Sequence, residues 1–192
     1  MSTTLVIVLR AASLFAFAAP MLLVSMRRGR APNTRTAQGR SDRMPVLANV
    51  AAFALFFPSL LALSGALEGS VALLLALTGC LLAVAGAAVV LRSRMELGPA
   101  WSFVPVADEV TGLVTAGPYR HVRHPIYLGL SMLALGQSLA FASWPAFLVL
   151  FAGIVPTFIW RAAAEEKLLA ATFGERYALH RTQTKMIIPH LL

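Results

Sequence analysis

Two short segments hold most of the side chains in this sequence that could take part in chemistry. Residues 117–129 read Gly-Pro-Tyr-Arg-His-Val-Arg-His-Pro-Ile-Tyr-Leu-Gly, with two arginines, two histidines and two tyrosines. The other segment is the adjacent pair of carboxylates Glu165 and Glu166. Polar groups at the edge of long apolar segments are costly to keep, so we expect them to bind something polar.

His124-Pro125 has the pattern of a helix start, because proline lacks an amide hydrogen and suits the first helical turn. This places His124 at the cap and Tyr127 and Gly129 in the first turns. Free backbone amides at a helix start can receive an anionic group such as a carboxylate. From this segment alone, a structural interpretation stays equally open, with His124 only capping the helix and the nearby arginines contacting lipid headgroups.

The acidic pair strengthens the functional interpretation. Arg161 precedes Glu165 by four residues, so the two can pair on one face of a helix, which by itself indicates only a solvated helix. The alternative is that one glutamate faces the loop that carries His124 and binds a positively charged or hydroxyl-bearing ligand. Both segments are expected on the same side of the membrane, so they can meet.

Other kinds of site receive little support. His121 and His124 are three residues apart, but no third ligand has suitable spacing, and we expect no metal. The sequence has no Gly-x-Gly-x-x-Gly or Walker-type loop for a nucleotide. No Ser-His-Asp arrangement is indicated by spacing.

The elements that position these groups are long and apolar. Hydrophobic residues make up 58% of the 192 residues and charged residues only 12%, well below the share in a soluble domain. A helix of about 20 residues crosses about 30 Å of hydrocarbon. The sequence predicts an all-α, polytopic membrane bundle of about five transmembrane helices plus a cytoplasmic C-terminal helix. The predicted spans are 5–26, 46–67, 71–91, 126–142 and 144–160.

We expect one membrane domain, 1–192, with three spans in 1–92 and the catalytic half in 93–192. Its first part, 93–124, is rich in glycine and proline and is predicted to be a loop with turns. In the third span, Gly79 and Gly86 are expected to allow close helix packing.

The last two spans meet at Ser143-Trp144-Pro145 and are expected to form a helical hairpin, with Pro156 kinking its second member. The chain then continues as a helix through 161–179 and is predicted to fold back at Phe173-Gly174.

The net charge of +8 could suggest nucleic acid as a partner, but the apolar composition favours basic loops that face the cytoplasm and anionic lipid. Cations concentrate in 27–43 and after the third and fifth spans, whereas 64–70 contains none. The positive-inside rule therefore predicts an outside N-terminus and a cytoplasmic C-terminus and site. We expect the membrane to be a prokaryotic inner membrane. Arg10, near the start of the first span, is expected to snorkel outward or to pair inside the bundle.

Taken in order, these pieces resemble the isoprenylcysteine carboxyl methyltransferase family, to which phospholipid methyltransferases are related. The resemblance rests on Leu-Val-Thr-x-Gly-Pro-Tyr at 113–119, Arg-His-Pro-x-Tyr-x-Gly at 123–129 and the acidic pair, followed by Phe173-Gly174, Tyr177 and Ile188-Pro189. It covers 113–189, and the first three spans match only as apolar helices.

The resemblance implies S-adenosylmethionine as methyl donor, in a cytoplasm-facing pocket, with a lipophilic acceptor entering from the bilayer. It assigns the cofactor to Leu113, Val114, Gly117, Pro118, Tyr119, His124, Pro125, Tyr127, Gly129 and Glu165. The candidates for catalytic roles are Glu166, Arg161 and His180. His180 stands where the family often has tyrosine, and Lys185 and Met186 where it often has Pro and Arg. These departures concern the identity of the acceptor.

The expected reaction is an in-line displacement at the sulfonium methyl. A carboxylate of the isoprenylcysteine type is already ionised and needs only a cation, such as Arg161, Arg120 or Arg123. A thiol or phospholipid amine would need a base, such as His180, His124 or Glu166. The absence of an obvious paired base favours the carboxylate.

Two other classes of protein remain open. Nicotinamide-dependent membrane reductases of the sterol-reductase type have a similar His-Pro segment and acidic helix. A non-catalytic membrane subunit that kept the pocket is the other.

Overall fold

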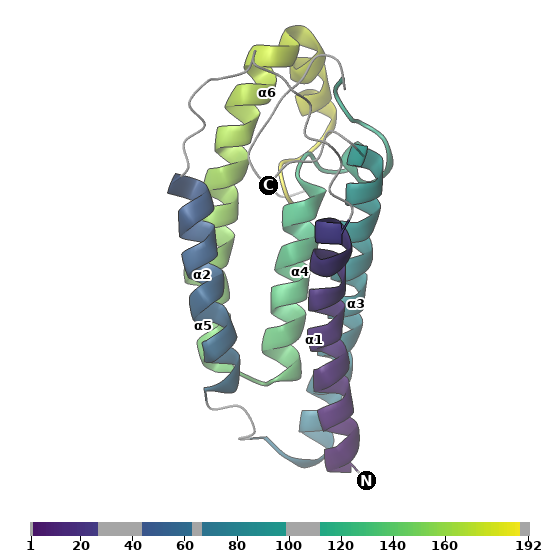
Figure 1. The fold of residues 1–192 in the computed structure, drawn as a ribbon, viewed down its shortest axis with the longest axis vertical. Coiled ribbons are helices and arrows are strands. Elements are labelled where there is room, and N and C mark those ends of the chain that lie inside the picture. The colour runs from purple at the N-terminus through teal and green to yellow at the C-terminus, as the bar shows by residue number, and fades with distance from the viewer. Residues whose placement is uncertain (1, 27–43, 63–66, 99–111, 189–192) are drawn as a thin grey trace.

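The computed structural model describes residues 2–26, 44–62, 67–98 and 112–188. These residues form an all-helical bundle without a strand, which confirms the predicted fold class. The chain passes up and down between the two ends of the bundle (Figure 1). The elements are α1 (Ser2–Met26), α2 (Met44–Leu61), α3 (Gly69–Leu97), η2 (Gly117–Arg120), α4 (Pro125–Ala140), α5 (Trp144–Val149), the π-helical turn η3 (Leu150–Ile154) and α6 (Val155–Gln183).

Each of the five predicted apolar runs forms a helix in the expected place. Three helical stretches, Met44–Leu61, Gly69–Leu97 and Trp144–Gln183, are long and apolar enough to cross a membrane by length and composition. Thr3–Ala19 and Pro125–Ala140 are apolar but shorter. The helices are therefore confirmed, while five membrane crossings remain a prediction. The arginine-rich segment 27–43 lies outside the described residues.

α3 is longer than predicted. We expected a loop from residue 93, but the helix continues to Leu97 and ends before Gly98, which has φ 50°. Arg92 Nη2 and Glu96 Oε1, one helical turn apart, form an ion pair at 2.9 Å in this extension. The prediction was wrong because hydrophobicity marks where an apolar run ends, and charged residues paired at i and i+4 can carry a helix further.

Small residues join α3 to α4. A side chain on Gly79 would clash with backbone atoms of Gly136 and Ala140, and a Cβ on Gly129 would lie 2.8 Å from the backbone oxygen of Gly86. Any larger residue would have to push the two helices apart. This confirms the expectation that Gly79 and Gly86 serve helix packing.

Aromatic side chains fill the space between the remaining helices. α2 packs against the continuous helix α5–η3–α6, where Asn49 Nδ2 donates to Thr157 Oγ1 at 3.1 Å. Phe53 of α2 contacts Phe17 of α1 and Phe158 of α6, with ring centroids 5.8 and 6.0 Å apart. The main core therefore lies between α2, α4 and α6.

The turn between α4 and α5 is as tight as predicted. The amide of Ser143 donates to the oxygen of Ser138 and the amide of Ala142 to that of Leu139, a helix-ending motif in which Ala142 takes a positive φ of 49°. The hydroxyl of Ser143 then accepts from the amide of Ala146 at the start of α5. The predicted hairpin is therefore confirmed.

Within the second member of the hairpin, the helix widens into the π turn η3 just before Pro156. Proline lacks the amide hydrogen that an α-helix uses at this position, and a π turn is one way to accommodate the missing bond. The helix is therefore irregular just before Pro156, while the kink expected at this residue stays a prediction.

Arg10 pairs inside the bundle at the end where α4 finishes. Its Nε donates to the backbone oxygen of Ala140 at 3.0 Å, and its guanidinium lies 5.5 Å from the ring centroid of Phe141. The charge is thereby placed at the carboxyl end of a helix, where the backbone dipole favours a cation.

Candidate active site

The two chemistry-bearing segments meet at one end of the bundle. The end of α3, the start of α4 and the bent part of α6 all lie there, away from the N-terminus (Figure 1). Arg123 and His124, just before α4, form ion pairs with Glu165 and Glu166 of α6. The two segments therefore meet, as the functional interpretation of the sequence requires.

His124 lies between the two adjacent carboxylates. Its Nδ1 is 3.4 Å from Glu165 Oε2 and its Nε2 is 3.6 Å from Glu166 Oε1, and the side chain is only 5% exposed. A neutral imidazole can donate from one nitrogen only, whereas the imidazolium can donate from both. Burial by itself lowers the pKa of His124, but the hydrogen bonding and charge of the two glutamates outweigh it and raise the pKa above 6.5. The site therefore favours a charged His124.

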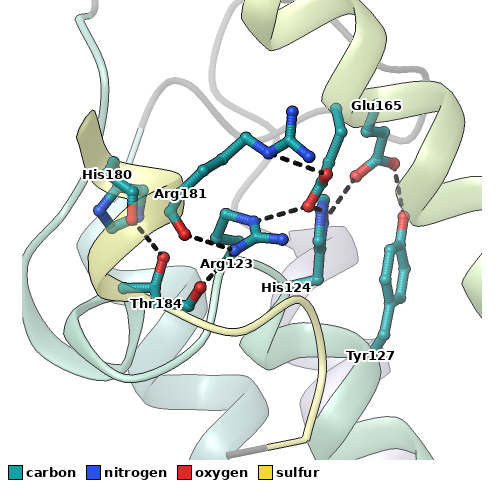
Figure 2. Close-up of polar contacts among 8 residues, drawn as sticks. Arg123, His124, Tyr127, Glu165, His180, Arg181 and Thr184 are labelled. Carbon is teal, nitrogen blue, oxygen red and sulfur yellow. Dashed lines mark hydrogen bonds and ion pairs between the residues drawn. The ribbon is translucent and has the colours of Figure 1, made fainter. Parts of the chain in front are cut away.

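Each carboxylate also has its own partners (Figure 2). Glu165 Oε1 accepts a hydrogen bond from the hydroxyl of Tyr127 and lies 3.2 Å from Arg161 Nε. Glu166 Oε1 lies 2.6 Å from Arg123 Nε, with both side chains 9% exposed. Both carboxylates are therefore held in fixed orientations by buried or half-buried groups.

A stack of rings stands beside the acidic pair. The rings of His124 and Tyr127 are nearly parallel at 14° with centroids 5.6 Å apart, and those of Tyr127 and Phe158 at 18° and 4.9 Å. The guanidinium of Arg161 lies 5.6 Å from the centroid of the Tyr127 ring. Because His124, Tyr127 and Phe158 are all buried, the stack fixes the orientation of the imidazole and of the tyrosine hydroxyl.

The chain returns to this site after a sharp bend. Gly174 has φ 49° and ψ −123°, a conformation that is not helical and that glycine adopts most readily, so α6 kinks there as predicted. Beyond the kink, the backbone amides of Arg123 and His124 donate to the oxygens of Lys185 and Met186 at 2.8 and 2.9 Å. The C-terminal segment is therefore fixed to the entrance of α4.

The segment before α4 forms another border of the site. Gly117 has φ 59°, and a Cβ there would lie 2.6 Å from Glu96 Cγ at the end of α3. Tyr119 is buried, and its pKa is raised by burial and the charge of Glu165, while Arg94 partly opposes the shift. Leu113 and Val114 are half-buried and, within the described part of the chain, have no hydrogen bond to the acidic pair.

The structure thus brings together Glu165, Glu166, His124, Tyr127 and Arg161. His180 does not join them, since it lies on the opposite side of Arg123 from Glu165 in Figure 2. Two further predicted residues occupy structural positions. The buried Pro125 begins α4, as its missing amide hydrogen predicts, and Gly129 faces α3. Pro118 lies in η2.

Sequence reasoning missed several residues of this end of the bundle. Arg123 was expected as a lipid contact, as part of the motif at 123–129 or as a cation for the acceptor, but not as a partner of Glu166, and Glu96, Arg181 and Thr184 were not singled out. For Arg123 a signal exists, because it directly precedes the His-Pro pair. The last motif residue, Pro189, lies outside the described residues.

The arrangement defines a class of protein, an all-α bundle with membrane-length helices and a charged, partly buried site at one end. The family described as phospholipid methyltransferase matches residues 74–176, more than half of the chain, including the entrance to α4 and the acidic pair. The chain belongs to this family.

A named relative adds a second comparison. The protein-S-isoprenylcysteine O-methyltransferase of Schizosaccharomyces pombe is 34% identical to this chain over 77 residues. The aligned part makes up 40% of this chain and 33% of the relative, so the match spans one third of the relative's length.

Proposed function

We propose that this protein transfers a methyl group from S-adenosylmethionine to a carboxylate of a lipophilic acceptor in a membrane. The observation that carries the proposal is the network in which His124 lies between Glu165 and Glu166 at one end of an apolar bundle. Membership of the phospholipid methyltransferase family supports a methyl-transfer reaction. The name of the yeast relative supports a carboxylate of the isoprenylcysteine type.

The residues present suit the cofactor. Glu165 and Glu166 can accept hydrogen bonds from an ammonium group or from ribose hydroxyls. Nε2 of His124 is buried and faces Glu166 Oε1 at 3.6 Å, so a charged His124 supports the negative charge of that carboxylate. Tyr127 and Phe158, both buried in the main core, stack beside these groups and hold them in place. When bound, S-adenosylmethionine supplies a methyl group already activated on a sulfonium.

The protein itself then has to align the cofactor with the acceptor and to exclude water from the site. Correct placement of two reactants can contribute about 7–11 kcal/mol to lowering a barrier. A carboxylate acceptor is already ionised near neutral pH and needs a cation to hold it. Arg161 is a candidate because its guanidinium lies between Glu165 and the face of Tyr127.

The acceptor can be tested by direct assay. Purified protein in lipid nanodiscs would be given S-adenosylmethionine with a labelled methyl group and either a prenylated cysteine or phosphatidylethanolamine. We expect a base-labile methyl ester on the prenylated cysteine, and no proton release, since a carboxylate loses no proton on methylation. Methylated phosphatidylethanolamine would instead support an amine acceptor of the kind that the family description suggests.

Cofactor binding separates methyl transfer from the other classes. Calorimetric titration with S-adenosylhomocysteine should give saturable binding, and titration with NADPH should not. Binding of NADPH alone would support a reductase, and binding of neither would overturn the proposal.

The acidic pair can be tested with a matched pair of variants. Glu166→Gln keeps the shape of the side chain but removes the charge, so we expect affinity for S-adenosylhomocysteine to fall about ten- to a hundredfold. Glu175→Gln, an exposed carboxylate in the same helix, is the control and should bind as the wild type does. Equal affinity of both variants would remove Glu166 from the site.

A further inference from the structure

Arg123 connects parts of the chain that are far apart in sequence. Its Nε lies 2.6 Å from Glu166 Oε1 in α6. Its Nη1 donates to the backbone oxygen of Thr184 and lies 3.5 Å from that of Arg181. Its backbone amide donates to the oxygen of Lys185 at 2.8 Å. One half-buried residue at the entrance of α4 thus binds both Glu166 and the C-terminal segment (Figure 2).

The chemistry of the guanidinium suits this position. Arginine presents several N–H donors in a rigid planar fork, so it can serve a carboxylate and a backbone oxygen at once in defined directions. Lysine would bring the same charge but only a compact ammonium without the fork. The contacts therefore use the shape of the side chain as well as its charge.

The C-terminal segment has further anchors on the same side. Val122 and Lys185 form a parallel bridge, and the amide of His124 donates to Met186 at 2.9 Å. Ile187, only 5% exposed, packs into the main core. Residues 184–187 therefore lie along the entrance of α4, directly beside the imidazole that contacts the acidic pair.

We propose that Arg123 is a positioning residue, which orients Glu166 and docks residues 184–187 as one wall of the site. It acts through these groups and does not contact the cofactor or the acceptor. The effect of Arg123 on methyl transfer rests on the proposed function, whereas the docking of residues 184–187 does not.

Hydrogen exchange measured by mass spectrometry tests the docking. In Arg123→Gln and in Arg123→Lys, the backbone amides of 122–124 and 184–187 should exchange about tenfold faster or more, because the guanidinium bonds are lost. Arg120→Gln is the matched control, since Arg120 is an exposed arginine on the same segment. Its exchange should equal that of the wild type. Wild-type exchange in Arg123→Gln would overturn the docking.

A second readout separates positioning from simple loss of structure. Lysine keeps a cation near Glu166, so affinity for S-adenosylhomocysteine should be partly restored in Arg123→Lys relative to Arg123→Gln. Protection of 184–187 should not be restored. If lysine restored both protection and affinity fully, the role assigned to the fork would be wrong.

The segment can also be released without changing Arg123. Ile187→Ala removes its buried anchor and should speed exchange in 184–187 and lower affinity for S-adenosylhomocysteine severalfold. Faster exchange with unchanged affinity would show that the segment is no wall of the site. If the wild type bound no S-adenosylhomocysteine, the proposed function would be overturned. The exchange data alone would still support or overturn the docking of residues 184–187.

Discussion

At the scale of single residues, the charge on His124 organises the site. Both ring nitrogens face carboxylate oxygens, and Arg123 and Arg161 hold those carboxylates from the other side. The cationic form of His124 can donate to both glutamates, while the neutral form can donate to only one of them. The integrity of this end of the bundle should therefore depend on a proton.

The sign of this dependence follows from the raised pKa of His124. Its protonated form contributes stability that is fully present below pH 6.5 and is lost as the pH rises through the pKa in the folded protein. We predict that the thermal unfolding midpoint in detergent falls as the pH rises above 6.5, and that His124→Gln reduces this fall. A variant with the same pH dependence as the wild type would contradict the assignment.

Tyr127 offers a second test at the same scale. Tyr127→Phe removes the hydroxyl that donates to Glu165 but keeps the ring stacked between His124 and Phe158. Loss of a hydrogen bond to a buried charged group should lower the free energy of unfolding by about 1.5–3 kcal/mol. Chemical denaturation of the wild type and of Tyr127→Phe measures this difference in the free energy of unfolding. A difference below about 0.5 kcal/mol would mean that Glu165 does not depend on this bond.

At the scale of elements, glycines set the distance between α3 and α4. In Gly136→Ala, the new Cβ would lie 2.6 Å from the oxygen of Gly79 and 2.7 Å from the amide nitrogen of Ala83, both backbone atoms. We predict a loss of about 1–3 kcal/mol or more in unfolding free energy, because the clash with backbone atoms can be relieved only if the two helices move apart.

The matched control for this prediction is another helical glycine. A Cβ on Gly153 would meet its nearest neighbour, the Cβ of Ala52, at an ordinary 3.6 Å. Gly153→Ala should therefore change stability by no more than about 1 kcal/mol. Thermal melts of both variants provide the measurement, and equal losses would show that the close approach of α3 and α4 carries no special cost.

These elements also show what a sequence can predict. Apolar runs and proline positions locate helices well, and the bend at Gly174 agrees with the freedom of glycine to adopt a positive φ. The extension of α3 to Leu97 and the docking of residues 184–187 escaped prediction. The extension rests on a pair of charges one helical turn apart, Arg92 and Glu96, which hydrophobicity does not reveal. The docking depends on contacts between groups that only the fold brings together, such as Arg123 with the oxygen of Thr184.

At the scale of the whole molecule, polar groups are divided unequally between the two ends. The acidic pair and Arg123, Arg161 and Arg181 gather at one end, and α3 begins at the other (Figure 1). The apolar length between them suits a bilayer. If the bundle spans a membrane, the site must therefore face one aqueous side only, and the positive-inside rule predicts the cytoplasm.

Cysteine labelling tests this orientation directly. Cys80 is the sole cysteine, so Cys80→Ala provides a background without thiols. In this background, Ser70→Cys places a thiol on an exposed residue at the start of α3, and Glu175→Cys places one on an exposed residue just beyond the kink. A membrane-impermeant maleimide should label the first variant in intact cells and the second only after permeabilisation. The reverse pattern would place the site outside, and labelling of both variants in intact cells would show that the two ends do not lie on opposite sides of a membrane.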